Sequence, residues 1–382
     1  MKKITKHAIA AICVVLLLLC APTCFADADA LDSIYQATSE RLLECPLPNV
    51  GSVGGEWLVI GLARAKIIPQ KTASMYYENV AAYVDKIGSA TLDRNKSTEN
   101  SRVILALTAI GKDPTDVCGY NLLQPLSDFS FVKKQGINGP VWTLISLDSL
   151  QYDIPEGTSS DTTTREKIIT YILDKQMESG GWGISSTNAD LDMTGMVIQA
   201  LAPYYDKIPD VKTAVDHALQ FISVHQCSGG GFSEASESPE RCAQIITALA
   251  ALGIDLEKDD RFIKNGNSIV DCLMGFALVN GFSHDKNGVY NQMSTEQAFY
   301  ALTAFNRLRQ CQSSLYDMCD LLMEFDLNLD GKVDITDATL AQKAIAEIVK
   351  LSLRQLKIAQ ADAQGNVHVT YVTDTQRYIA AH

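Results

Sequence analysis

Short apolar blocks recur along the chain, and each of them is hydrophobic on nearly every side of a helix. Helices of this kind are buried inside a protein, whereas a surface helix keeps one polar face. The blocks follow one another at intervals of about forty to fifty-five residues and occupy residues 58–63, 103–108, 142–147, 196–201, 245–250 and 299–304. The spacing therefore predicts a set of buried helices with a similar repeat length.

Amphipathic segments alternate with the apolar blocks. Their hydrophobic residues follow the helical period, and they occupy residues 32–43, 74–87, 121–131, 163–176, 211–226 and 269–277. Because no single pair of an outer and an inner helix can bury its apolar member alone, repeats of this length indicate a closed helical array. Strand signals are scarce. The pattern predicts an all-α protein with an (α/α)6 toroid over residues 27–319.

Glycine and aromatic residues mark the turns between outer and inner helices. Residues 176–183 read QMESGGWG, residues 226–233 read QCSGGGFS, and residues 280–283 give the looser copy NGFS. Glycine allows a tight turn at the end of a helix, and we expect the aromatic ring to pack back over the helix ends. This pattern resembles the repeats of squalene and hopene cyclases and of protein prenyltransferase β-subunits. That superfamily is built as an (α/α)6 toroid, and the resemblance covers about residues 32–317.

The resemblance to the cyclases implies one place to look for catalysis. Their Asp-x-Asp-Asp motif, at the start of an inner helix, protonates an isoprenoid alkene, a step that needs a buried carboxylic acid. In this chain Asp192 corresponds to that acid, and Met193 replaces its carboxylate neighbour. Acids also favour the N-terminus of a helix. We therefore interpret Asp190 or Asp192 as a helix cap and keep Asp192 as the single catalytic candidate.

The sequence holds fewer of the residues that other classes of enzyme need for catalysis. The prenyltransferases need zinc, but His217, His225 and His284 show no ligand spacing. A glycosidase needs two facing carboxylates. Acids near the starts of inner helices could ring one mouth of the toroid or cap the helices singly: Glu99, Asp192, Glu240 and Glu296. Aromatic residues that could line a cavity or, as is commoner at this spacing, belong to the core are Trp57, Trp142, Trp182, Phe299 and Tyr300.

The most specific pattern lies near the C-terminus, in residues 326–337. Oxygen-bearing side chains fall at positions 1, 3, 5, 9 and 12 of a twelve-residue loop, and Gly331 stands at position 6, where a calcium loop turns sharply. Position 7 supplies only its backbone carbonyl. The pattern predicts a calcium ion held by Asp326, Asn328, Asp330, Lys332, Asp334 and Asp337.

A second copy of the loop follows at residues 360–371, with Gly365 at position 6 and Val367 at position 8. Each loop precedes a predicted helix, over residues 337–346 and from residue 372 onward. The ligand positions of the second loop hold Gln360, Asp362, Gln364, His368 and Tyr371, which leaves one formal negative charge where the first loop has four. Calcium binds more weakly to a loop whose ligands carry less negative charge. We therefore predict that the second loop binds calcium weakly or not at all.

Two such loop–helix repeats resemble a type I dockerin, which we place at residues 320–382. In that family the repeats bind calcium, and the folded pair plugs a secreted protein into a cohesin module of a cellulosome scaffold. The resemblance therefore implies calcium as the cofactor and a cohesin as the partner. The positions that it implies for partner contact are Ile335, Thr336, Gln342, Lys343, Val369, Thr370, Gln376 and Arg377.

Residues 1–26 read as a secretory signal. Three lysines precede an uncharged apolar run over residues 8–20, and a small-x-small cleavage site ends at Ala26. The run is too short to span a bilayer, which takes about 20 residues. A lipoprotein signal at Cys20 is the alternative, although a leucine just before the cysteine fits it poorly. We expect a secreted, soluble protein without a membrane span, attached to a cell surface at most through its scaffold.

The net charge of −13 becomes −16 when the three lysines of the signal are removed. So acidic a protein is unsuited to nucleic acids and anionic membranes. Seven cysteines remain outside the signal, scattered and without CxxC spacing. They indicate neither a zinc site nor a dense disulfide framework, although a single bridge such as Cys227 with Cys242 stays open.

Two hypotheses about function follow from these patterns. In the first, the toroid is a non-catalytic binding or structural module of a cellulosome-like complex, and it presents a concave surface to a polysaccharide, a peptide or a hydrophobic ligand. In the second, the toroid is an enzyme, either a degenerate relative of class II terpene cyclases or a carbohydrate-active protein. No Pro/Thr-rich linker precedes Leu321, which predicts that the dockerin-like part packs directly on the toroid.

Overall fold

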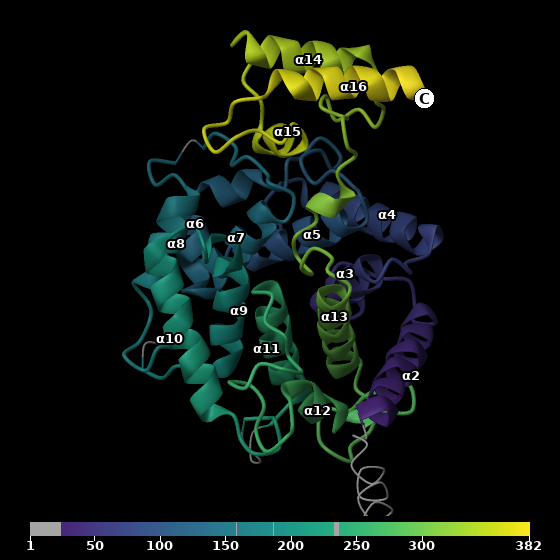
Figure 1. The fold of residues 1–382 in the computed structure, drawn as a ribbon, viewed down its shortest axis with the longest axis vertical. Helices are drawn as coiled ribbons and strands as arrows, with labels where there is room; N and C mark the ends of the chain where they lie inside the picture. The colour runs from purple at the N-terminus through teal and green to yellow at the C-terminus, as the bar shows by residue number, and fades with distance from the viewer. Residues whose placement is uncertain (1–23, 158, 186, 233–236) are drawn as a thin grey trace, which may run out of the picture.

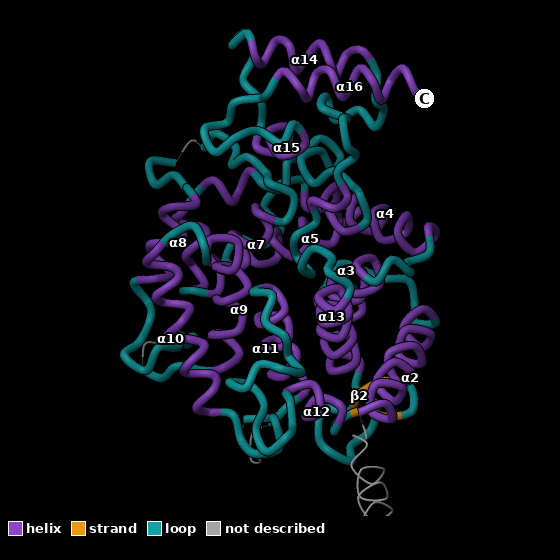
Figure 2. Tube along the Cα trace, viewed as in Figure 1, coloured by secondary structure: helices purple, strands orange, loops and turns teal. Residues whose placement is uncertain are grey.

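The computed structural model describes residues 24–157, 159–185, 187–232 and 237–382. This part of the chain is mostly helical (Figure 1, Figure 2), and its named strands form one two-residue hairpin, Ala277–Leu278 (β1) paired with Gly281–Phe282 (β2). The all-α prediction is therefore confirmed. In these ranges no helix combines the length and the apolar character needed to cross a membrane. Almost all of the predicted signal, with Cys20, lies outside the described residues.

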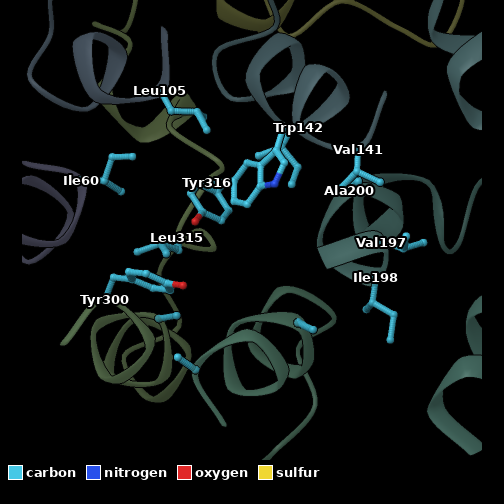
Figure 3. Close-up of a cluster of buried hydrophobic side chains, with 14 of the residues drawn as sticks. Ile60, Leu105, Val141, Trp142, Val197, Ile198, Ala200, Tyr300, Leu315 and Tyr316 are labelled. Carbon is cyan, nitrogen blue, oxygen red and sulfur yellow. The ribbon is translucent and has the colours of Figure 1, made fainter. Parts of the chain in front are cut away.

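In the described ranges, each predicted apolar block lies within an α-helix. We call these the inner helices: α3 (Trp57–Arg64), α5 (Ser97–Ala109), α7 (Asn138–Asp148), α9 (Leu191–Leu201), α11 (Pro239–Ala251) and α13 (Gln292–Arg309). Each inner helix contacts the next one along the chain, and α13 returns to contact α3. The inner helices thus form a closed ring of contacts. Figure 3 shows side chains of several of them, among them Ile60, Leu105, Trp142 and Tyr300, around a common interior.

The outer helices are α2 (Cys24–Leu43), α4 (Gln70–Ile87), α8 (Arg165–Leu173), α10 (Pro209–His225) and α12 (Ile269–Met274). The helix predicted over residues 121–131 is wrong. That stretch contains a 3-10 turn, Gln124–Ser127 (η2), followed by the one-turn helix α6 (Phe129–Val132) and the 3-10 turn η3 (Lys133–Gln135). Its backbone instead bonds to a neighbouring segment, since Phe129 N–H donates to Asp161 O at 2.8 Å and Thr163 N–H to Ser127 O at 2.9 Å.

The loops that carry the Gly-Gly-aromatic pattern repeat one hydrogen-bond scheme. The Gln176 side-chain amide donates to Gly180 O at 2.7 Å, and that of Gln226 donates to Gly230 O at 2.7 Å. Both glycines have φ above +80°, a conformation that favours residues without a Cβ. The aromatic rings of Trp182, Phe232 and Phe282 are buried. This burial agrees with the expectation that the rings pack back over the helix ends.

The C-terminal part contains α14 (Ile335–Ile345), α15 (Leu353–Ile358) and α16 (Val369–Ala381). Helices α14 and α16 lie side by side (Figure 1). They enclose a hydrophobic cluster separate from that of the ring: Leu327, Ala338, Ala341, Leu351, Ile358, Ala359, Tyr371 and Val372. Both long helices begin earlier than predicted, because the last loop residues already form their first turn. The prediction missed α15, which is only six residues long.

The segment between the ring and the C-terminal part is fixed by two buried arginines. Arg64 and Arg307 both pair with Asp320, at 2.9 and 2.8 Å, and only 2% and 3% of their side chains are exposed. The C-terminal part also contacts the ring directly. Leu353 N–H donates to the Asp153 carboxylate at 3.3 Å, and the Arg354 guanidinium lies over the Tyr152 ring at 4.8 Å.

Candidate functional site

The N-terminal ends of the inner helices meet around a cavity of about 430 Å³, which we call the ring cavity. Its volume falls in the range of small-molecule sites, about 300–1,000 Å³. Every inner helix contributes to its lining, which includes Trp57, Arg102, Asn138, Trp142, Asp192, Met196, Glu240, Gln244, Met293 and Gln297. A wider depression of about 1020 Å³ is lined by residues 174–179, 183–185 and 187–191 and by Phe221 and His225 of α10. We favour the ring cavity as the site because it gathers side chains from the whole ring.

Aromatic rings form one side of the ring cavity. The centroid of Trp57 lies 5.2 Å from that of Trp142 and 5.9 Å from that of Tyr300, and Trp142 meets Tyr316 edge-on at 5.9 Å. Gln244 Nε2 donates to the Tyr300 hydroxyl at 2.7 Å. Burial raises the pKa of Tyr300 and of Tyr316 well above the usual range of a phenol, so both stay neutral.

The other two aromatic residues proposed for a cavity belong to the core instead. Trp182 is fully buried, and its indole N–H donates to Ile172 O at 2.8 Å. Phe299 points outward from the ring and stacks on Tyr35 of α2 with centroids 5.0 Å apart. Sequence spacing could not separate these two from Trp57 and Trp142, because all of them occur at helix-compatible positions.

Each charged side chain of the ring cavity has an ionisable partner. Asp192 Oδ2 lies 3.2 Å from Arg241 Nη2. Glu240 accepts the Ser294 hydroxyl and lies 3.1 Å from His284 Nδ1. The hydrogen bond between His284 and Glu240, together with the charge of Glu240, raises the pKa of His284. Arg102 in turn lies between Glu99 and Glu56.

The two aspartates at the start of α9 have different roles. Asp190 is the helix cap, since its Oδ1 accepts the Met193 N–H at 2.6 Å. Asp192 instead faces the ring cavity, with 39% of its side chain exposed and a guanidinium as its partner. This environment differs from the buried acid that alkene protonation needs.

Two further acids near the cavity are fully buried and hold the turn at residues 51–55. Glu296 is 1% exposed and accepts the Gly54 N–H at 2.9 Å and the Gln292 amide at 2.6 Å. Burial raises its pKa to about 7. Glu56 accepts the Gly51 N–H at 2.9 Å and the Tyr76 hydroxyl at 3.2 Å, and burial raises its pKa as well. Sequence reasoning missed Glu56, although an acid just before an apolar block was a usable signal.

Of the acids proposed to ring the mouth, the structure therefore brings Asp192 and Glu240 to the cavity lining. Glu99 pairs with Arg102 beside it, and Glu296 turns away into the protein. His217 and His225 both lie on α10, two turns apart, and His284 lies in the loop after β2. Among the residues described, no three or more His, Cys, Asp or Glu side chains gather in a way that would hold a metal ion.

The cysteines lie apart in the described ranges except for one close pair. The Sγ atoms of Cys242 and Cys272 are 3.5 Å apart, and both residues are buried. Cys227, the partner considered for Cys242, instead contacts the Phe232 carbonyl oxygen at 3.0 Å. In this structure all of these cysteines are free thiols.

A second candidate site is the loop at residues 326–337, which winds around two carboxylates. Asp326 is 6% exposed and accepts the backbone N–H groups of Asp330 at 3.1 Å and Gly331 at 3.0 Å. Asp337 is fully buried and accepts those of Asn328 and Asp334, both at 2.9 Å. Burial raises the pKa of Asp326, and the charges of Asp337 and Asp330 add to the effect. The loop thus holds carboxylates close to one another in a partly dry place.

The donor set of this loop suits calcium, which prefers oxygen ligands and carboxylates above all. Its remaining side chains bond within the loop: Asn328 Nδ2 donates to Asp330 Oδ2 at 3.0 Å, and Asp334 Oδ1 accepts the Thr336 hydroxyl at 2.6 Å. Lys332 N–H donates to Asp330 Oδ1 at 2.9 Å, and the lysine is exposed. The ligand types and the two central carboxylates fit the ion, and calcium binding stays a prediction.

The second loop lacks this arrangement. Asp362 accepts the backbone N–H groups of Gln364 and Asn366 at 2.9 and 2.8 Å. At position 12 stands Tyr371, which is buried in the C-terminal hydrophobic cluster, with Phe325 at 5.7 Å between centroids. A core residue thus occupies the place that an acid fills in the first loop.

All residues predicted to contact a partner are exposed: Ile335, Thr336, Gln342, Lys343, Val369, Thr370, Gln376 and Arg377. Ile335 and Val369 are apolar, yet 59% and 67% of each is exposed, at the first positions of α14 and α16. The two repeats therefore present matching apolar residues at corresponding places.

No protein-family model matches this chain, and no curated protein matches it either. Function is therefore inferred from the two sites themselves.

Proposed function

We propose that the protein is a secreted subunit of a cellulosome-like complex, in which a dockerin-type module at residues 320–382 docks through calcium onto a cohesin. An (α/α)6 toroid would then serve as a non-catalytic binding module in polysaccharide degradation. The observation that carries the proposal is the first loop, which winds its backbone around the buried carboxylates of Asp326 and Asp337.

The surface of the C-terminal part also supports docking. Ile335 and Val369 lie exposed at the starts of α14 and α16. Isolated exposed apolar residues are common on proteins, but these two occupy corresponding positions in the two repeats. Polar side chains accompany each of them in the same repeat: Thr336, Gln342 and Lys343, and Thr370, Gln376 and Arg377. Each repeat thus presents one exposed apolar residue together with polar ones, and interfaces combine apolar and polar residues in the same way.

A non-catalytic toroid is favoured by the surroundings of Asp192. Its carboxylate is part-exposed and paired with Arg241, while the helix cap is supplied by Asp190. A cyclase-like acid would have to be buried and poised to give up a proton. The lining of the ring cavity also carries the charged side chains of Arg102, Asp192 and Glu240, which suit a terpene poorly.

Capture by immobilised cohesins tests the docking proposal. We expect the intact protein to be retained by at least one cohesin of a scaffold panel in calcium and released by a chelator. Asp326→Ala should abolish retention, whereas the matched change in the second loop, Asp362→Ala, should leave most of it. Retention that survives both the chelator and Asp326→Ala, or no retention on any cohesin by a calcium-loaded protein, would contradict the proposal.

A carbohydrate-active enzyme is the second candidate, because Asp192 and Glu240 both face the ring cavity and glycosidases work with a pair of carboxylates. Release of reducing ends from plant polysaccharides decides the matter. An enzyme would lose this activity in both Asp192→Asn and Glu240→Gln with folding intact, whereas a binding module shows none to lose.

A further inference from the structure

The ring is closed at the end opposite the ring cavity. Residues 313–319 cross that end, and Leu315, Tyr316 and Met318 are buried there. Figure 3 shows Leu315 and Tyr316 between the side chains of the inner helices, with Tyr316 beside Trp142. We call residues 313–319 the plug.

Buried arginines hold the plug in place. Arg64 Nη2 donates to the carbonyl oxygens of Ser314 and Asp317 at 3.2 and 2.9 Å, and Arg307 Nε donates to Ser313 O at 2.8 Å. A smaller cavity of about 290 Å³ lies on the far side of Tyr316 and shares no lining residue with the ring cavity. The ring cavity is therefore a pocket with one opening rather than a channel.

The lining of this pocket combines aromatic faces with side chains that both donate and accept hydrogen bonds. Trp57 is half-buried, so part of its ring is open to the pocket. The amide of Asn138 offers a donor and an acceptor, and Gln297 offers its Nε2 as a donor. The amide of Gln244 is instead bonded to Tyr300, Gln297 and Gln199. Hydroxyl groups, which donate and accept at once, are the natural partners of such a lining.

The charges of the pocket favour an uncharged ligand. Asp192 is paired with Arg241, Glu240 with His284, and Arg102 with Glu99. A ligand with a net charge would have to compete with these internal pairs for its counter-charge. A paired carboxylate still accepts hydrogen bonds on its free lone pairs, so it can receive the hydroxyls of a neutral molecule.

We infer that the ring cavity binds the end of a neutral saccharide chain, with a sugar ring against Trp57 and its hydroxyls bonded to Asn138, Asp192, Glu240 and Gln297. This rests on the proposed role of the toroid as a binding module. The C–H groups on the face of a pyranose meet the negative face of the indole, and the polar side chains receive its hydroxyls. Because the plug closes the far end, the pocket takes a chain terminus and cannot thread an internal segment.

Intrinsic fluorescence of the intact protein tests this inference. The chain has three tryptophans; Trp57 and Trp142 line the pocket, and Trp182 is buried in the core. Titration with cello-, xylo- and manno-oligosaccharides should change the emission for at least one neutral series. The change should persist in a chelator, because the site lies far from the calcium loop in the chain and makes no use of it. Loss of docking and loss of sugar binding are thereby distinguished.

Variants assign the binding to the ring cavity. We expect Trp57→Ala to weaken affinity roughly tenfold or more, which equals about 1.4 kcal/mol, and Trp57→Phe to weaken it less. Tyr83→Ala, an exposed aromatic on α4, is the matched control and should have no effect. Circular dichroism of each variant checks folding. Binding that is unaffected by Trp57→Ala would overturn the inference.

The length and ends of the ligand test the closed pocket. Affinity should rise with the first sugar units and then level off, and a bulky group on one particular end of the oligosaccharide should abolish binding. Equal binding of chains blocked at both ends would overturn the inference, because it would require a groove. Failure of all neutral saccharides, or binding of a prenyl alcohol or a peptide in their place through Trp57, would overturn it as well.

Discussion

Glu296 shows how single residues near the ring cavity are held in unfavourable surroundings. Its carboxyl is buried, and both of its protein partners, the Gly54 N–H and the Gln292 amide, are neutral donors. Glu56, another buried acid of the same turn, adds its repulsion. A carboxyl in such a place favours the protonated form. The turn at residues 51–55 therefore depends on pH.

We predict that Glu296 makes stability fall as the pH rises from about 4.5 to 7. Its folded-state pKa of about 7 lies above its ordinary value of 4.5, so protonation stabilises the fold below pH 4.5, and this contribution is lost as the pH passes 7. The free energy of unfolding of the wild type, relative to Glu296→Gln, should drop by on the order of 3 kcal/mol across this window.

Urea unfolding at several pH values measures this difference. Glu78→Gln, an exposed residue on α4, controls for the loss of one negative charge. A difference between the wild type and Glu296→Gln that stays flat from pH 4.5 to 7 would show that Glu296 is ionised in the folded protein.

At the scale of elements, hydrogen bonds tie the turns with the Gly-Gly-aromatic pattern to the inner helices that follow them. The Thr194 hydroxyl accepts a hydrogen bond from the backbone N–H of Trp182 at 3.0 Å, and the Thr295 hydroxyl accepts one from the backbone N–H of Phe282 at 3.0 Å. A threonine on the inner helix thus fixes the aromatic of the preceding turn in two repeats. Gly180 and Gly230 lie against the backbone of His217 and Ser268, in or beside the next outer helix.

Gly230→Ala should destabilise the protein more than another glycine substitution of similar backbone conformation. A Cβ at Gly230 would lie 1.9 Å from Ser268 O, whereas one at Gly253 would meet nothing within 4 Å, and both glycines have positive φ, +82° and +71°. Gly253→Ala should cost about 1–2 kcal/mol for its left-handed conformation. Gly230→Ala adds the clash and should exceed about 3 kcal/mol. Thermal unfolding compares the two, and equal losses would contradict the packing of this turn.

The apolar blocks could be predicted because burial requires helices that are hydrophobic all round, and that property is local in the sequence. The amphipathic spacing of residues 121–131, by contrast, predicts one continuous helix that the structure does not contain. Leu122, Leu123, Leu126, Phe129 and Phe131 are all buried, so their spacing imitates a helix, but the backbone there pairs with residues 161–163. Burial alone does not specify how the backbone hydrogen bonds are satisfied.

At the scale of the whole molecule, the plug joins the ring to the C-terminal part and closes the ring interior. Nothing in the sequence of residues 313–319 indicates this role, because it depends on two arginines from α3 and α13, separated by more than two hundred residues. For the same reason the sequence proposed acids and aromatics for a mouth but could not say which would face it. Only the closed ring shows that Trp57, Trp142, Asp192 and Glu240 line the cavity and that the other proposed acids and aromatics do not.

Tyr316→Ala should open the ring from end to end. Tyr316 is buried between the two cavities and contacts Trp142, so its removal leaves a hole and should cost about 3–5 kcal/mol by analogy with other large-to-small aromatic changes. Tyr316→Phe keeps the ring of the side chain and should cost under about 1.5 kcal/mol. Urea unfolding measures both. Similar values for the two variants would show that Tyr316 does not fill the interior.

Calcium binding by the metal-free protein is the most direct test of the central claim. Isothermal titration should show one tight site per chain, lost in Asp326→Asn and kept in Asp362→Asn, because the ligand positions of the first loop carry four acids and those of the second carry one. This result would establish the ion that the docking proposal needs. No calcium binding, or a tight site that survives Asp326→Asn, would contradict the account.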